Sequence, residues 1–273
     1  MEKPNRGCRS MKVFNIAVVF AIFSVSMVWA QNPNVVLYMP FDEPPDGDLV
    51  KDLSIYENHG KIIGDVKWRK NGRFGGALEF SGTGKIEVPH SESLNLKGDM
   101  TLQIWFKTKE PQKGRFLIYK IHIGAGRNYE WGIYLTGGSQ TVSMYLVDPQ
   151  NQVKFVSKSG NWGDGEWHFL VGTYDGKAVR CYIDGELGGE VAWSGEVRTS
   201  EGSVVIGTWG GNYFIGMLDE ARILNMALTP EQIKKDYENG YQFSPVVSSG
   251  KLATKWGEIK KSELSPHQIH ASR

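Results

Sequence analysis

Short apolar runs separated by glycine-rich polar stretches make up most of the chain, and few of them have a helical period. Residues 101–108, TLQIWFKT, show the pattern most clearly. One set of alternating positions is apolar and the other set is polar with one tryptophan: Leu102, Ile104 and Phe106 against Gln103, Trp105 and Lys107. Because successive side chains of a strand point to opposite faces, this stretch predicts a half-covered β-strand.

Asp-Gly pairs at residues 175–176 and 184–185 separate three further apolar runs. Asp-Gly between alternating runs is typical of a hairpin turn, so residues 166–192 are predicted to form a three-stranded meander. Similar runs recur along residues 35–224, to a total of about a dozen strands, as expected for two packed antiparallel sheets. The 33 glycines fit an all-β chain with many turns.

One stretch departs from this pattern. Thr229, followed by Pro230, Glu231 and Gln232, forms a capping box with proline at the first helical position, and Gly240 stands where a C-terminal cap is expected. We therefore predict one short helix at about residues 230–239, where the strand pattern ends.

Residues 1–30 combine a basic lead, an apolar run and a small-residue cleavage site, Val28-Trp29-Ala30. This order predicts a signal peptide and a secreted, extracytoplasmic protein. Met11 opens an equally complete leader, so the chain has two candidate starts. An uncleaved anchor is the alternative, although the apolar run is shorter than the roughly 20 residues that a span prefers. No second such run follows, so no membrane span is expected after processing.

Charge and cysteine content narrow the class of protein. The body at residues 31–240 is mildly acidic and has no basic patch for nucleic acid. Residues 241–273 are polar and basic and are predicted to form a flexible tail, in which Trp256 has no assigned role. Only Cys181 remains after the leader is removed, so an intrachain disulfide is excluded. Its alternation with Val179 and Ile183 favours a buried structural role.

Several motifs in one order resemble a known family. They are GEWHFLVGTYDGKAVRCYIDG, FIGMLDEARILNMALTPEQI, FGGALEFSGTGKIEVP and MTLQIWFK. Together they closely resemble the laminin-G-like jelly-roll modules of the concanavalin A-like lectin and glucanase superfamily, over roughly residues 35–240. The resemblance implies a two-sheet antiparallel jelly-roll sandwich used for extracellular recognition, often of glycans and often with calcium. A fold does not determine a function, so the ligand remains an analogy.

Catalytic motifs of enzymes with this fold are not found. Asp219 and Glu220 are adjacent, so in a regular strand their carboxylates point to opposite faces and cannot share a substrate. The Gln-Ile-His triplet at residues 268–270 resembles one used by alginate lyases, but it lies near the C-terminus without partner motifs. We therefore expect a non-catalytic protein, and a polysaccharide hydrolase or lyase is the third alternative.

Oxygen ligands for calcium are dense near residues 42–60. The resemblance places the last strand beside the first, which brings Asp219 near Asp42 and this loop. We predict that Asp42, Asp219 and loop carbonyls hold one structural calcium, with ordinary solvated carboxylates as the alternative. Glu220 is expected to form an ion pair with Arg222, which shares its face.

Aromatic residues in or beside loops provide the candidate ligand site, because sugars stack on Trp and Tyr rings and hydrogen-bond to nearby polar groups. The candidates are Trp105, Arg127, Tyr129, Trp131, Trp193, Trp209, Asn212 and Tyr213. Trp105 is expected to form the floor of a groove on the sheet. The alternative for each ring is a cap on the end of the sandwich. The leading prediction is a module that binds a carbohydrate or glycoprotein, and the second is a protein adhesion module.

Overall fold

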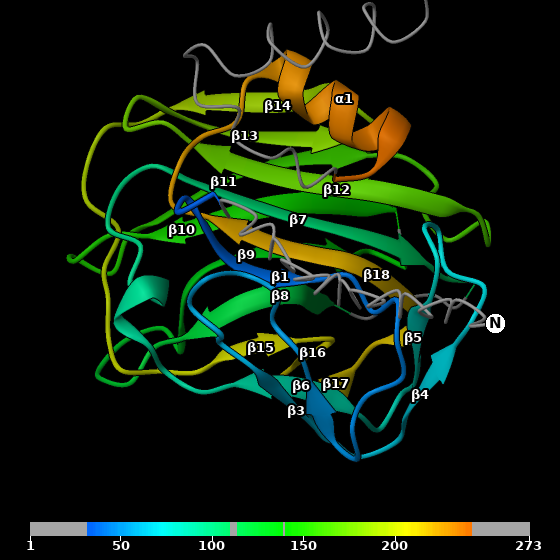
Figure 1. The fold of residues 1–273 in the computed structure, drawn as a ribbon. Helices are drawn as coiled ribbons and strands as arrows, with labels where there is room; N and C mark the ends of the chain where they lie inside the picture. The colour runs from blue at the N-terminus through cyan, green and yellow to red at the C-terminus, as the bar shows by residue number, and fades with distance from the viewer. Residues whose placement is uncertain (1–31, 110–113, 139, 242–273) are drawn as a thin grey trace, which may run out of the picture.

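Two antiparallel β-sheets lie face to face and enclose the main core (Figure 1). The computed structural model describes residues 32–109, 114–138 and 140–241. The predicted leader and the tail after Tyr241 lie outside the described residues. Within the described ranges, no helix is both long enough and apolar enough to cross a membrane.

The first sheet, sheet A, contains in spatial order β14 (Glu186–Ala192), β13 (Ala178–Ile183), β12 (Trp167–Tyr174), β7 (Met100–Lys107), β18 (Ile215–Leu224), β5 (Ala77–Ser81) and β4 (Val66–Arg69), with β1 (Val35–Met39) also paired with β18. The second, sheet B, contains β11 (Val153–Ser159), β10 (Thr141–Val147), β9 (Tyr129–Thr136), β8 (Arg115–Ile121), β15 (Val204–Ile206), β6 (Lys85–Val88), β3 (Gly60–Ile63) and β2 (Leu49–Val50). A small hairpin joins β16 (Thr208–Trp209) to β17 (Asn212–Tyr213), and the 3-10 helix η1 (Glu92–Leu94) precedes β7. The all-β, two-sheet prediction is confirmed.

Turn chemistry sets the predicted meander of β12, β13 and β14. The first turn contains Asp175-Gly176, and the second contains Asp184-Gly185. In the second turn both residues have positive φ, 53° for Asp184 and 82° for Gly185. Positive φ at two successive residues is the geometry of the tight turn whose twist matches a hairpin. Between these turns, Cys181 is buried in the main core, as predicted.

Strand β7 lies near the centre of sheet A, between β12 and β18. Leu102, Ile104 and Phe106 enter the main core, as the alternation predicts. The opposite face, which carries Trp105, is buried too, because helix α1 (Pro230–Asn239) covers it (Figure 1). The prediction of a half-covered strand was therefore wrong, since strand periodicity does not show what a distant helix covers.

Helix α1 begins at the predicted capping box. The Thr229 side chain accepts from the Gln232 N–H, and the Gln232 side chain accepts from the Thr229 N–H at 2.8 Å. Ile233 is fully buried against sheet A, and Tyr237 stacks on Trp105 with ring centroids 5.5 Å apart. The helix therefore fastens the C-terminal end of the described chain onto the outer face of sheet A.

Replacing Thr229 with alanine is expected to lower the free energy of unfolding by about 1 kcal/mol, because the Gln232 N–H loses its side-chain acceptor at the helix start. Urea denaturation measures the change. Lys234→Ala, at an exposed position on the same helix, is the control and is expected to change stability little. Equal stability of the two variants would contradict a stabilising role for this cap.

Candidate functional site

An aromatic cluster covers the outer face of sheet B, away from the main core. Its members, called here the aromatic face, are Phe116, Tyr119, Tyr129, Tyr134, Tyr145, Phe155 and Trp209. Strand register explains how they meet: Phe116 is opposite Tyr134 across β8 and β9, and Tyr145 is opposite Phe155 across β10 and β11. Cross-strand neighbours on one face lie within contact distance, so residues from five segments form one surface.

Gly132 makes the centre of this face possible. It lies opposite Tyr119 on β8 and Tyr145 on β10. A Cβ atom at this position would lie 2.7 Å from the Phe116 ring, which is too close. The missing side chain leaves space for that ring, which contacts Tyr119, Tyr134 and other members of the cluster.

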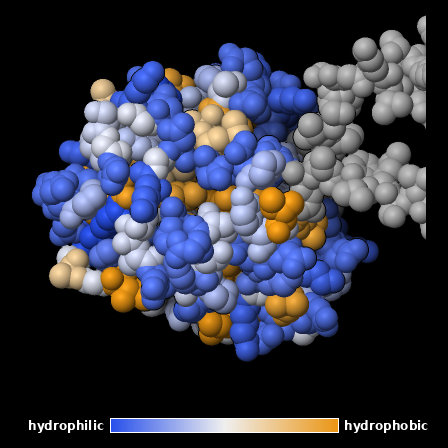
Figure 2. All heavy atoms as spheres, turned by 60° about the vertical axis from the view of Figure 1, so that its left-hand side comes forward, coloured by the Kyte–Doolittle hydropathy of each residue, from blue (hydrophilic) through white to orange (hydrophobic). Residues whose placement is uncertain are grey.

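Phe155 is the most exposed member of the aromatic face. It belongs to β11, the end strand of sheet B, and 53% of its surface is exposed. One side of its ring stacks on Tyr145, with centroids 5.3 Å apart and an interplanar angle of 14°. The other side is therefore available to a ligand. Figure 2 shows one side of the molecule, where hydrophobic residues form separate patches on a mostly hydrophilic surface.

Hydroxyl groups continue the aromatic face along β9, β10 and β11. Alternation from Tyr134, Tyr145 and Phe155 places them on the same face: Thr136, Thr141, Ser143, Ser157 and Ser159. Ser157 and Ser159 are exposed. On this part of the face, the described strand residues include no charged side chain. Flat apolar rings next to neutral hydroxyls are the groups that recognise an uncharged polyhydroxyl ligand.

Charged groups of the outer face lie at its other side, on β3 and β6. Lys85 and Glu87 form an ion pair at 2.6 Å, and Lys61 lies opposite Glu87. Burial first, and then the charge of Glu87, raise the pKa of Tyr119 to about 12. Tyr119 is therefore a neutral hydroxyl at physiological pH.

Four of the predicted ligand residues belong to or adjoin the aromatic face. Tyr129 contacts Phe116 at 5.2 Å, but it is 7% exposed. Trp209 contacts Phe116 and Tyr134 and remains half-buried. Tyr213 is fixed beside them, because the Arg115 guanidinium donates to its carbonyl oxygen at 2.6 Å. Asn212 is exposed on the same small hairpin.

The remaining predicted ligand residues lie elsewhere. Trp131 is completely buried in the main core, and Trp105 is 2% exposed beneath α1. Trp193 is half-buried and stacks on Tyr174 at 4.8 Å, as a ring that caps the sandwich would. Arg127 is exposed in the loop before β9, where its N–H donates to Asn151. The structure thus corrects the assignment of Trp105 and Trp131, which are not accessible to a ligand.

A second cluster contains the carboxylates of Asp42, Asp219 and Glu220, near the point where β1 lies beside β18. The Asp219 carboxylate accepts from the N–H groups of Arg73 and Phe74 at 2.7 and 3.0 Å, and Asp42 accepts from Gly76 at 3.3 Å. The two aspartates therefore hold the same loop between β4 and β5. The prediction that they come together is confirmed.

The strand geometry around Glu220 differs from the prediction. A register shift between Asp219 and Arg222 marks a β-bulge, and Glu220 has a φ of 53°. The bulge interrupts the alternation of faces, so the two adjacent carboxylates are not simply on opposite sides. Glu220 accepts from the Tyr38 hydroxyl at 2.9 Å. Arg222 instead pairs with Asp236, so the predicted Glu220–Arg222 ion pair was wrong.

Electrostatics in this carboxylate cluster favour protonation. Burial raises the pKa of Asp219 to about 7, although three backbone N–H groups act in the opposite direction. Burial and the charge of Asp219 raise the pKa of Glu220 to about 8. A cation placed here would relieve the repulsion, and hard carboxylate oxygens suit calcium. No group of three or more His, Cys, Asp or Glu side chains in the described ranges has the arrangement of a metal site.

Comparison with known proteins identifies the family. A family model described as the concanavalin A-like lectin/glucanases superfamily, of the laminin G type, matches residues 80–234. The chain belongs to this superfamily. Among curated relatives, mouse pappalysin-1 is 24% identical over 212 residues, which are 68% of this chain and 12% of that protein. Human pappalysin-1 is 27% identical over 137 residues, which are 44% of this chain and 8% of that protein. The chain thus spans about an eighth or less of these relatives.

Solved structures of other proteins share the fold. One is domain 4 of AbnA, an extracellular arabinanase from Geobacillus stearothermophilus, in complex with arabinotriose. It matches this chain with a TM-score of 0.59 and 21% sequence identity, and the match covers 74% of this chain and 97% of that chain. The ligand binding domain of botulinum neurotoxin serotype D, solved with N-acetylneuraminic acid, has a TM-score of 0.57 and 16% identity, with 76% and 51% covered. At such identity the likeness shows the fold alone.

Proposed function

We propose that this protein is an exported, non-catalytic recognition module that binds neutral glycans on the aromatic face of sheet B. One observation carries the proposal: the half-exposed Phe155 ring stands beside Tyr145, with exposed hydroxyls and no charged strand residue on the same face of β10 and β11. A sugar ring packs an apolar surface on an aromatic ring while its hydroxyls bond to neighbouring polar groups.

The family supports a binding role. Binding domains with this fold include an arabinanase domain in complex with arabinotriose and a neurotoxin domain in complex with N-acetylneuraminic acid. The first ligand is a neutral oligosaccharide and the second is an acidic sugar. The uncharged surface of β9, β10 and β11 favours the first class for this chain. Export is supported by the basic and apolar opening of the sequence.

A glycan array with neutral and acidic members tests this function. The full chain is expected to bind neutral glycans saturably and to leave acidic analogues unbound. If no glycan binds and a protein partner is retained, the adhesion alternative replaces this proposal. Release of reducing ends from the bound polysaccharide would instead establish an enzyme.

Calcium at the Asp42, Asp219 and Glu220 cluster is the second part of the proposal. Asp42 and Asp219 would hold the ion together with backbone carbonyls of the adjacent loops, and the ion would neutralise carboxylates whose pKa is raised. Its role would be structural, because the cluster joins the first and last strands of the domain. The array run with and without calcium shows whether glycan binding depends on this ion.

The free energy of unfolding in EDTA is expected to fall between about pH 4 and pH 8. The folded pKa values of Asp219 and Glu220 lie above their unfolded values, so the folded state binds more protons in this window and stability decreases as the pH rises. The change is on the order of several kcal/mol, since one pKa unit corresponds to about 1.4 kcal/mol. Urea denaturation at pH 5 and pH 8 measures it.

Two controls separate this cluster from other groups. Burial also raises the pKa of Glu130, to about 7, so the Asp219→Asn variant is needed to show which part of the slope comes from the cluster. Added calcium is expected to restore stability at pH 8 more than at pH 5, because only the ionised carboxylates bind it. A wild-type melting temperature that calcium and EDTA leave unchanged at pH 8 would contradict the calcium site.

A further inference from the structure

A cavity of about 340 Å³ lies beside the β1–β2 loop and is lined by residues of β2 in sheet B and β5 in sheet A, apart from the aromatic face. Its apolar walls include Phe41, Val50 and Leu78, which are buried, and Leu53, which is 40% exposed. Prolines 40, 44 and 45 stiffen the loop that forms one side. An open apolar cavity of this size holds a large side chain.

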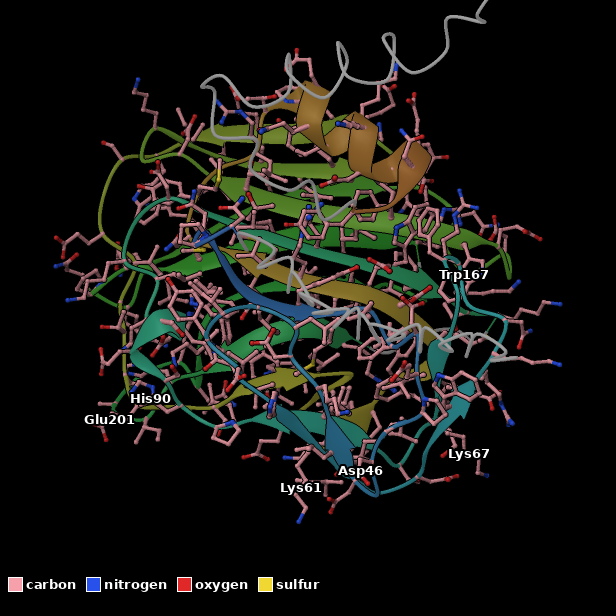
Figure 3. The ribbon with its side chains drawn as sticks, in the orientation of Figure 1. Asp46, Lys61, Lys67, His90, Trp167 and Glu201 are labelled. Carbon is pink, nitrogen blue, oxygen red and sulfur yellow. The ribbon has the colours of Figure 1, made fainter. Side chains whose placement is uncertain are left out.

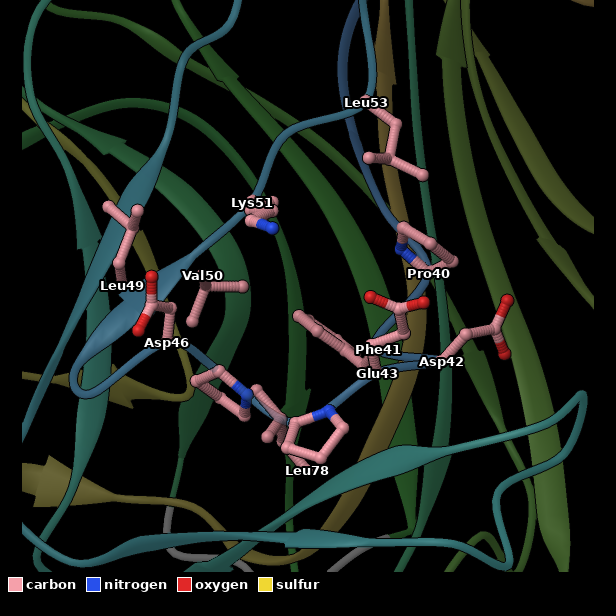
Figure 4. Close-up of a pocket in the computed structure, with 12 residues that line it drawn as sticks. Pro40, Phe41, Asp42, Glu43, Asp46, Leu49, Val50, Lys51, Leu53 and Leu78 are labelled. Atoms are coloured by element: carbon pink, nitrogen blue, oxygen red, sulfur yellow. The ribbon is translucent and has the colours of Figure 1, made fainter.

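Carboxylates surround this apolar space. Asp42, Glu43 and Asp46 line it, and Lys51 is the one cation among the lining residues. Figure 4 shows Asp46 and Asp42 on opposite sides of the cavity, with Glu43 between them. Figure 3 places Asp46 at the same end of the sandwich as Lys61. Lys61 pairs with Asp48, whereas the three lining carboxylates make no ion pair with any residue in the described ranges.

The charges and the apolar walls together select an occupant with a large apolar ring next to cationic groups. A segment of this chain has that composition: residues 251–261, KLATKWGEIKK, contain Trp256 next to Lys255 and four lysines against one glutamate. This segment lies outside the described residues. Trp256 has no part in the proposed glycan site.

The described chain ends close to the cavity. The ring of Tyr241, the last described residue, contacts the Tyr38 ring with centroids 5.1 Å apart. Tyr38 is two residues before Pro40, which lines the cavity. Residues 242–250 can extend for about 30 Å, at roughly 3.3 Å per residue. The segment can therefore reach the cavity.

We propose that residues 251–261 dock in this cavity of the same chain, with Trp256 against Phe41, Val50 and Leu53 and with lysines against Glu43 and Asp46. The docked segment would fasten the C-terminal end of the domain to the loop that follows its first strand. This intramolecular contact is independent of glycan binding, since none of the residues that line the cavity belongs to β9, β10 or β11, which carry the proposed glycan site.

Disulfide trapping in the full chain tests the proposal. Leu53→Cys at the cavity mouth is combined with Gly257→Cys next to Trp256, and Cys8→Ser removes the second native thiol, since Cys181 is buried. We expect the intrachain disulfide to form at least about tenfold faster than in the control pair Leu187→Cys with Gly257→Cys. Leu187 is 53% exposed on β14, away from the cavity.

The charge and ring contributions are tested in the same background. Glu43→Lys with Asp46→Lys, or Trp256→Ala, is expected to slow trapping at residue 53 to the rate of the control pair. Equal trapping rates at residues 53 and 187 in the unmodified background would overturn the proposal. A covalent dimer whose yield rises with protein concentration would also overturn it, because the occupant would then be a second copy.

Discussion

Replacing Phe155 with alanine is expected to weaken glycan binding about 10- to 100-fold, which corresponds to about 1.4 to 2.8 kcal/mol. The variant removes the exposed ring on which a sugar would stack and leaves Tyr145 with one uncovered side. Because Phe155 is 53% exposed, its loss is expected to change the free energy of unfolding little. Isothermal titration with the glycan selected by the array measures the affinity.

Leu187→Ala is the matched control for this variant. Leu187 is also 53% exposed and also belongs to the end strand of a sheet, but it lies on sheet A. The two variants therefore remove similar exposed apolar area from different sheets. Glycan affinity is expected to be unchanged in Leu187→Ala. If Phe155→Ala and the wild type bind the glycan with equal affinity, the aromatic face is not the binding surface.

Replacing Trp105 with alanine is expected to lower the free energy of unfolding by about 3 to 5 kcal/mol, the range for deleting a buried aromatic side chain. The ring contacts the rings of Phe169 and Tyr237, with centroids at 5.0 and 5.5 Å, and the Arg73 guanidinium lies 4.5 Å from its centroid. The substitution thus removes the contact that holds α1 on sheet A. Urea denaturation gives the change in stability.

Glycan affinity separates the structural role of Trp105 from a ligand contact. Below the denaturation midpoint, the folded fraction of Trp105→Ala is expected to bind the glycan with wild-type affinity, because the ring is on the opposite sheet from Phe155. Trp193→Ala is a second control, since this ring is half-buried against Tyr174. If Trp105→Ala has normal stability but does not bind the glycan, Trp105 belongs to the ligand site after all.

The sheets, the meander and the capped helix could be predicted from the sequence because each depends on local chemistry. The face that each strand presents depends on its partners. In β11, Phe155 shares a face with Val153 and Ser157, but the alternation of side chains does not show which face of the strand points to solvent. Tyr145 and Phe155 were therefore missed, although their spacing beside hydroxyl residues in TVSMYLV and VKFVSKS was the available signal.

β-bulges account for two specific errors. Regular alternation places Tyr129 and Trp131 on one face, but a register shift between β8 and β9 leaves Tyr129 on the aromatic face and Trp131 in the main core. A second bulge at Glu220 changes the relation between Asp219 and Glu220. A bulge depends on pairing with a distant strand, so the local pattern did not reveal either one.

A structure of the protein bound to its glycan tests the central claim most directly. Crystals of the full chain soaked with the neutral oligosaccharide selected by the array are expected to show a sugar ring against the uncovered side of Phe155, with hydroxyls near Ser157. A sugar bound only elsewhere, such as beside Trp193 or in the cavity near Glu43, would contradict the assignment of the aromatic face.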